Sequence, residues 1–231
     1  MGARGGGGDG GARGARGDGS GGSAASGGPD EPVSVHGGPM PVHGGFVSVH
    51  GGLVSVHRGL VVLVGPPASG KTAFRRELVA QGRIDPEAVV SSDDIRAELF
   101  AGSPSADPEV FDERDRRIGA RLAAGLVAVA ESTNVTPEAR ARLAALARRF
   151  GAPVTVLRFA QDEDVLLRQH EERARDDMSA ADVSAYAAVM RRHASRDQLL
   201  AEGAAFVHDV PGRGQGVTAA EAARRFTFGR P

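Results

Sequence analysis

The sequence predicts an α/β domain in which a parallel sheet of about five strands carries helices on both faces. Short apolar runs rich in β-branched residues recur from residue 60 onwards, and segments with helical periodicity separate them. Such near-continuous runs are typical of parallel strands, which are buried on both faces. The first run, residues 60–64, leads into a glycine-rich loop and then a helix, which is the order of a strand–loop–helix unit.

The other elements have recognisable boundary signals. Asp107-Pro108 and Thr136 are typical helix starts, and Ser179 with Asp182 three residues later predicts a capping box. We expect the remaining strands at residues 88–91, 126–130, 154–159 and 204–207. We expect the helices at residues 73–80, 92–100, 107–124, 137–150, 162–175 and 180–202, with a short last helix from residue 218.

Composition limits the class of protein. With 231 residues, of which 41% are hydrophobic and only 4% aromatic, the chain can build one core of ordinary size from Ala, Val and Leu. The absence of cysteine excludes disulfides, thiolate metal sites and cysteine nucleophiles, and it fits a reducing compartment, so we expect a cytoplasmic protein. No apolar run approaches the roughly 20 residues that span a bilayer, so we expect no membrane partner. The net charge of −1 disfavours the coating of long nucleic acid.

The chain divides by composition into three parts. Residues 1–58 are rich in glycine and arginine and should form a disordered tail; residues 59–210 form the domain; residues 211–231 are a C-terminal extension with a short helix. A seven-residue repeat in the tail places histidine at positions 36, 43, 50 and 57. The paired glycines and the lack of nearby carboxylates argue against a preorganised metal site, and tandem duplication is the simpler explanation. We expect nothing before Arg58 to be needed for the fold.

The glycine-rich loop carries the strongest functional signal. Gly65, Gly70, Lys71 and Thr72 match the pattern G-x-x-x-x-G-K-[ST], with Pro66, Pro67, Ala68 and Ser69 between them. Backbone N–H groups of such a loop, together with the dipole of the following helix, cradle phosphate oxygens. Lys71, the only lysine in the chain, suits the β- and γ-phosphates, and the Thr72 hydroxyl suits Mg²⁺. The loop therefore predicts a nucleoside triphosphate, ATP, as a ligand together with Mg²⁺.

Two more polar clusters follow predicted strands and should meet the loop at the carboxyl edge of the sheet. In the first, Asp93 and Arg96 stand three residues apart at a helix start, where a carboxylate could accept a hydroxyl proton and a guanidinium could hold a phosphate. The alternative is a capping Asp with a solvated Arg, and Asp94 is a second candidate for the base. The other cluster is Glu131-Ser132-Thr133-Asn134.

A charged helix after the fourth strand predicts a lid over the phosphates. Arg168 and Arg175 are two turns apart and share a helix face, so both could stabilise charge on the transferred group. The alternative is a solvated helix with charge pairs four residues apart.

These motifs together resemble the polynucleotide-kinase-like P-loop kinases, a group of AAA-type ATP-binding proteins in the P-loop NTPase superfamily. The resemblance covers about residues 60–210 and implies that Lys71 contacts the phosphates, Thr72 ligates Mg²⁺ and Asp93 is the general base. It also implies that Arg96 holds the acceptor's phosphate and that Arg168 and Arg175 act from the lid. Two departures from the family pattern stand out: Glu131 occupies a place where the family has aspartate, and Arg173 could exchange roles with the other lid arginines.

Three functions follow from these observations. The first is an ATP- and Mg²⁺-dependent phosphotransferase acting on a short nucleic-acid end, as a polynucleotide 5′-hydroxyl kinase does. The second is a kinase for a small hydroxyl-bearing acceptor such as a sugar, nucleoside or antibiotic, which the near-neutral charge favours. The third is an ATP-binding regulatory NTPase without a kinase acceptor.

Overall fold

The computed structural model describes residues 52–100, 107–173 and 178–229, which all belong to one compact unit, Ser48–Pro231. Its centre is a five-stranded sheet in the order β3-β4-β2-β5-β6, and every neighbouring pair is parallel. The strands are β2 (Leu60–Val64), β3 (Val89–Ser91), β4 (Ala128–Glu131), β5 (Val154–Arg158) and β6 (Phe206–Asp209). The predicted fold class is confirmed.

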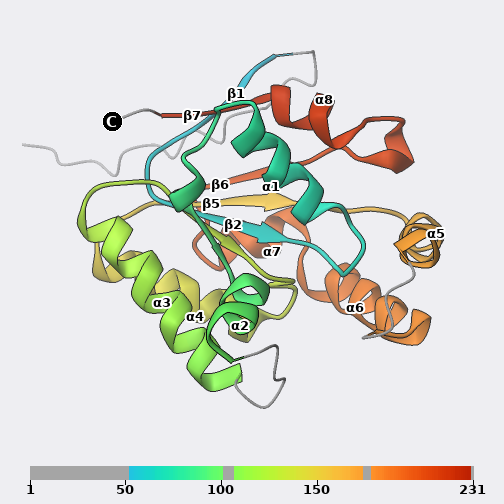
Figure 1. Ribbon diagram of the computed structural model, residues 1–231, viewed down its shortest axis with the longest axis horizontal. Helices are drawn as coiled ribbons and strands as arrows, with labels where there is room; N and C mark the ends of the chain where they lie inside the picture. The colour runs from blue at the N-terminus through green and yellow to red at the C-terminus, as the bar shows by residue number, and fades with distance from the viewer. Residues whose placement is uncertain (1–51, 101–106, 174–177, 230–231) are drawn as a thin grey trace, which may run out of the picture. The chain divides into compact units, whose positions relative to one another are not determined.

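Helices cover both faces of this sheet (Figure 1). One face carries α1 (Lys71–Ala80) and α8 (Ala219–Arg224), which contact each other. After β5 the chain forms α5 (Glu163–Arg173), which packs beside α6. The helices that pack on the other face are α2 (Ser92–Phe100), α3 (Asp107–Ala123), α4 (Pro137–Arg149), α6 (Ala180–His193) and α7 (Arg196–Ala201). Two short 3₁₀ helices, η1 (Pro86–Ala88) and η3 (Arg213–Gln215), complete these connections.

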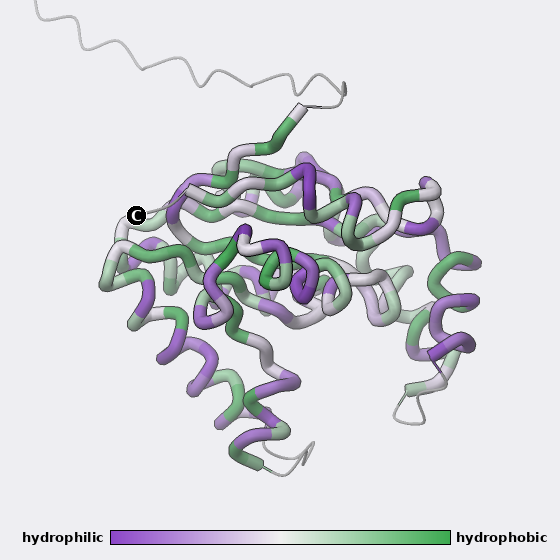
Figure 2. Tube along the Cα trace, turned by 45° about the horizontal axis from the view of Figure 1, so that its top comes forward, coloured by the Kyte–Doolittle hydropathy of each residue, from purple (hydrophilic) through white to green (hydrophobic). Residues whose placement is uncertain are grey.

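Strand β2 lies at the centre of the sheet and contributes to both cores. All five of its residues are buried, with Leu60, Val62 and Val64 in the cluster under α3 and α4 and Val61 and Leu63 in the cluster under α1 and α8. This alternation follows from the two-residue period of a strand. Figure 2 shows apolar residues along the inner strands, whereas residues of both kinds alternate along the outer helices.

A second, two-stranded parallel sheet joins the two ends of the described chain. In it, β1 (Val54–Val56) pairs with β7 (Phe226–Phe228). Val56 and Phe226 are almost fully buried in the core under α1, and the Phe226 ring meets the ring of Phe74 edge-on at 5.4 Å. The expectation that nothing before Arg58 serves the fold is therefore wrong, and part of the C-terminal extension belongs to the same core.

Helix boundaries agree with the sequence where a side-chain cap sets them. Thr136 accepts a hydrogen bond from the backbone of Ala139, and Ser179 forms the predicted capping box with Asp182. The predicted single helix over residues 180–202 is wrong, because a second capping box at Ser195 starts α7 as a separate helix. The last strand of the large sheet, β6, begins two residues later than predicted.

Candidate functional site: a phosphate loop and its surroundings

The glycine-rich loop connects the end of β2 to the start of α1, as the sequence predicts. The Gly65 N–H donates to the carbonyl of Thr133 at 3.0 Å, which ties the loop to the segment after β4. A Cβ on Gly65 would lie 2.7 Å from Ser69 Oγ and 2.8 Å from Phe159 Cβ, so packing requires glycine there. Gly70 needs glycine for a different reason, since its φ of 95° is in the left-handed region. The backbone thus has the form of a cradle for an anionic group at the start of α1.

Lys71 lies inside this loop. Its side chain is buried, and Nζ donates to the carbonyls of Gly65 at 2.7 Å and Pro66 at 2.8 Å. The pKa of Lys71 is lowered to about 8, chiefly by burial and to a smaller degree by the charge of Arg173, while the charges of Glu131 and Asp93 act in the opposite direction. The hydrogen bonds of the ammonium group therefore go to groups of the loop that carry no net charge, and a phosphate would offer it full negative charge instead.

We expect ATP to raise the pKa of Lys71 well above its value in the free protein. A triphosphate favours the charged amine, so its affinity should be highest below pH 8 and should fall as the pH rises through about 8. The chain has one lysine, so selective ¹³C labelling of lysine gives a single side-chain resonance whose pH titration can be followed by NMR with and without a non-hydrolysable ATP analogue. A pKa near 10.5 in the free protein, or no response to the analogue, would contradict this account.

A network of charged groups adjoins the loop. Thr72 Oγ1 donates to Glu131 Oε1 at 2.7 Å, and Arg75 Nε forms an ion pair with Glu131 Oε2. The other two guanidinium nitrogens of Arg75 contact both carboxylate oxygens of Asp94, at 3.0 and 3.3 Å. Glu131 is only 6% exposed, and this burial raises its pKa, while the Thr72 hydrogen bond and the charges of Arg75 and Lys71 act against the shift. The sequence reasoning did not single out Arg75.

The oxygen atoms of this network fit Mg²⁺. Hydroxyl and carboxylate oxygens are the donors that this cation prefers, and Thr72, Glu131 and Asp94 supply them within one connected set. Thr72, at the second position of α1, would hold the ion beside the phosphates, and the carboxylate of Glu131 is the neighbouring candidate.

The two candidate bases on α2 have different surroundings. The Asp93 side chain is 80% exposed and pairs with Arg96 at 3.2 Å. Its negative charge acts to raise the pKa of Lys71. Both carboxylate oxygens of Asp94 instead contact the guanidinium group of Arg75. Arg96 also pairs with Asp107 at the start of α3. Within the part of the chain that the structure describes, the buried Ser92 hydroxyl and Arg96 Nε have no hydrogen-bond partner.

Of the two predicted lid arginines, Arg168 and Arg175, the structure describes only Arg168. Arg168 is exposed and pairs with Asp164 of its own helix at 3.1 Å. It does not line the hollow that lies beside the loop, between the start of α1 and helix α5. Arg173 does line that hollow, and its positive charge acts to lower the pKa of Lys71. Arg175 lies outside the described residues. Which arginine of α5 faces the site depends on how the helix is rotated about its axis. Packing against α6 sets this rotation, so no local sequence pattern favoured Arg173.

A hollow of about 460 Å³ lies beside the loop, which is within the usual size range of small-ligand sites. The start of α1, helix α5 and the segment between β6 and α8 form its walls, and an ion pair between Arg213 and Glu172 joins the last two. Apolar residues on its walls include Phe159, Val210, Pro211 and Val217. Part of the predicted C-terminal extension therefore builds the site, which the sequence did not indicate.

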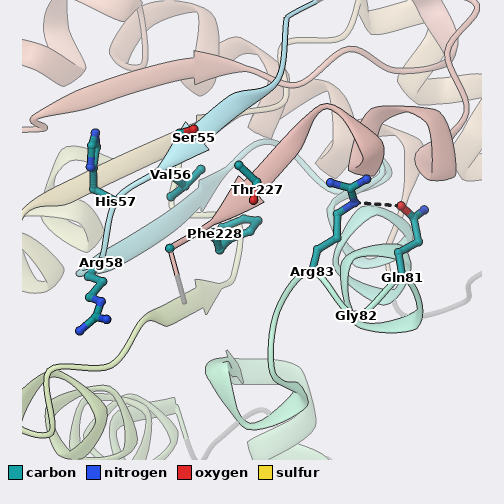
Figure 3. A pocket seen from close by; sticks show the side chains of 10 residues that line it. Ser55, Val56, His57, Arg58, Gln81, Gly82, Arg83, Thr227 and Phe228 are labelled. Carbon is teal, nitrogen blue, oxygen red and sulfur yellow. Dashed lines mark hydrogen bonds between the residues drawn. The ribbon is translucent and has the colours of Figure 1, made fainter. Parts of the chain in front are cut away.

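A larger hollow, of about 680 Å³, lies along β1, β7 and the end of α1 (Figure 3). Arg83 there donates to Gln81 and to the carbonyl of Phe226, and Figure 3 shows Arg58 and Arg83 well apart and not pointing toward each other. No residue of the phosphate loop lines it. The hollow beside the loop is therefore the candidate site.

The sheet, the loop and the flanking helices define a P-loop fold. The sequence matches the family described as an AAA domain over residues 60–199, which is more than half of the chain. The chain belongs to this family. No curated protein matches the sequence.

Several solved structures are similar to this chain, and the first of them has a TM-score above 0.5. A chain in the structure of the Pnkp1/Rnl/Hen1 RNA repair complex is 19% identical with a TM-score of 0.51, and the match covers 59% of this chain and 45% of that one. This chain thus spans less than half the length of that relative. A gluconokinase from Sinorhizobium meliloti 1021 is 17% identical with a TM-score of 0.45, over 73% of this chain and 89% of that one. A shikimate kinase from Acinetobacter baumannii, bound to shikimate, is 20% identical with a TM-score of 0.42, over 73% and 90%.

None of the described helices combines the length and the apolar character needed to cross a membrane.

Proposed function

We propose that this protein transfers the γ-phosphoryl group of ATP to an acceptor hydroxyl, with Mg²⁺ as the cofactor. The observation that carries the proposal is the placement of two groups at the carboxyl edge of the sheet. The buried Lys71 starts α1 after β2, and the Asp93–Arg96 pair stands at the start of α2 after β3. A carboxylate paired with an arginine beside a phosphate loop can accept the proton of a second substrate and hold an anionic group on it. The geometry therefore supports a kinase over a regulatory NTPase.

The residues divide into a donor side and an acceptor side. The loop from Gly65 to Thr72 cradles the phosphates through its backbone N–H groups, and Lys71 neutralises charge on the β- and γ-phosphates. The hollow lined by Phe159 and Arg173 takes the nucleoside of ATP. Arg173 is the described arginine best placed to act from α5, and Arg175 stays a prediction. When bound at Thr72, Mg²⁺ neutralises negative charge on the phosphates during transfer.

Transfer then needs one proton acceptor and one in-line displacement. The acceptor oxygen forms a bond to the γ-phosphorus while the bond from that phosphorus to the β–γ bridging oxygen breaks, and ADP leaves. The carboxylate of Asp93 accepts the proton of the acceptor hydroxyl. Arg96 holds an anionic group on the acceptor, and the unpaired Ser92 hydroxyl and Arg96 Nε offer further hydrogen bonds on this side.

In the first form of this proposal the acceptor is the 5′-hydroxyl of a polynucleotide. Arg96 would then bind the first backbone phosphate next to that hydroxyl. A small hydroxyl metabolite is the second candidate, and the net charge of −1 favours it. A regulatory role without an acceptor is the third.

An acceptor screen with [γ-³²P]ATP separates the two kinase forms. We expect label to appear in short single-stranded oligonucleotides with a 5′-hydroxyl and not in matched oligonucleotides that already carry a 5′-phosphate. Label in a pool of sugars and nucleosides, with none in the oligonucleotides, would replace the first acceptor class with the second.

A further inference from the structure

Arg75 contacts groups from three parts of the candidate site. It lies on α1, one helical turn after Lys71, and its guanidinium pairs with Glu131 at the end of β4 and with Asp94 on α2. The side chain is only 16% exposed. An arginine fork that holds two carboxylates from different elements fixes their relative position, which a single ammonium group cannot do to the same degree.

Each of these two carboxylates is next to a group with a proposed role. Glu131 accepts the hydrogen bond of Thr72, the proposed Mg²⁺ ligand. Asp94 follows Asp93, the proposed base, in the first turn of α2. A tether on Asp94 therefore also fixes where α2 begins relative to the phosphate loop.

We propose that Arg75 is a positioning residue that sets the distance between the phosphate loop and the acceptor-binding start of α2. The proposal rests on the proposed function for its kinetic part, but the tether itself is a structural property. Arg75 does not touch the reacting atoms and acts through Asp94 and Glu131.

Alternative roles for Arg75 fit these contacts less well. An isolated surface ion pair contributes little, whereas Arg75 is largely buried and its two partners are the buried Glu131 and the more exposed Asp94. A direct phosphate ligand would aim its guanidinium at the phosphate loop, whereas the Arg75 guanidinium lies between the carboxylates of Glu131 and Asp94. The two partners on separate elements point to a tether.

The chain offers a matched control in Arg76, which is the next residue on α1 and is exposed. Three variants form the test: Arg75→Gln removes both ion pairs, Arg75→Lys keeps the charge but loses the fork, and Arg76→Gln leaves the tether intact. Asp94→Asn breaks only the contact with α2, so it keeps the test open if Arg75→Gln does not fold.

Hydrogen exchange measured by mass spectrometry tests the tether without any activity. Amides of residues 91–96 should exchange about tenfold faster in Arg75→Gln and Asp94→Asn than in the unmodified protein, because local opening becomes easier. Arg75→Lys should be intermediate, and Arg76→Gln should match the unmodified protein. Equal exchange in Arg75→Gln and Arg76→Gln would overturn the proposal.

Kinetics test the consequence for transfer. In Arg75→Gln, kcat should fall by about 10²-fold and the acceptor KM should rise, since a small misplacement of reacting groups has an effect of this size. The dissociation constant for ATP should change by less than about threefold, because its loop contacts remain. A variant that weakens ATP binding and leaves kcat unchanged would overturn the positioning role.

The two proposals fail in different ways. If the unmodified protein labels no acceptor but residues 91–96 still exchange faster in Arg75→Gln, the kinase proposal fails and the tether stands. If transfer occurs and the exchange of these residues does not respond to Arg75, the tether fails and the kinase proposal stands.

Discussion

Lys71→Ala abolishes phosphoryl transfer from [γ-³²P]ATP while the protein stays folded. The variant removes the one ammonium group inside the phosphate loop, and the chain has no second lysine to take its place. The fold should survive because the hydrophobic contacts of β2 and α1 do not involve the ammonium group. Transfer is measured as acceptor-bound label, and folding is measured by circular dichroism and thermal unfolding.

Lys71→Arg is the matched control for charge. It keeps a cation but replaces a slim group with a planar guanidinium, which the contacts with Gly65 and Pro66 leave little room to accept. We expect transfer to stay low in this variant too. Turnover in Lys71→Ala that equals that of the unmodified protein would remove the phosphate loop from the account.

Asp93→Asn lowers kcat by at least about 10²-fold, the low end of general-base contributions, and leaves ATP binding intact. The amide keeps the size of the side chain but cannot accept the proton of the acceptor hydroxyl. The measurements are single-turnover transfer and the dissociation constant of a non-hydrolysable ATP analogue. Glu98→Gln, on the same helix and paired with Arg117, is the control and should transfer normally.

Loss of ATP binding in Asp93→Asn would place that carboxylate in the metal site instead. An unchanged rate in Asp93→Asn would show that Asp93 is not the base and would return attention to Asp94.

The sequence predicted those parts of the site that depend on neighbours along the chain. The loop from Gly65 to Thr72 could be predicted because its glycines and the flanking strand and helix lie within a few residues of each other. The capping signals at Thr136 and Ser179 were readable for the same reason. The parallel sheet followed from the apolar runs, although β4 and β6 begin later than the runs suggested.

The features that the sequence did not reveal depend on contacts between distant segments. The pairing of β1 with β7 joins Val54 to Phe226, and no local pattern links these residues. Arg75 looked like one of many arginines on polar helix faces, and its role appears only when α1, α2 and β4 meet. The choice between Arg168 and Arg173 depends on how α5 is rotated against α6, where Leu166 packs on Val183.

The capping box at Ser195 is a different case. Its signal, a serine followed three residues later by Gln198, was present in the sequence, but the helical periodicity on both sides favoured one long helix. The break ends α6 at His193, and residues 202–205 connect α7 to β6.

The fate of the γ-phosphoryl group tests the central claim most directly. In a reaction of the unmodified protein with [γ-³²P]ATP, Mg²⁺ and a 5′-hydroxyl oligonucleotide or a pool of small hydroxyl compounds, the label can be followed into acceptor and into inorganic phosphate. We predict that most of the label enters an acceptor and that this fraction disappears in Asp93→Asn. Label found only in inorganic phosphate, with every acceptor, would contradict a phosphotransferase and would support an ATP-hydrolysing regulatory protein.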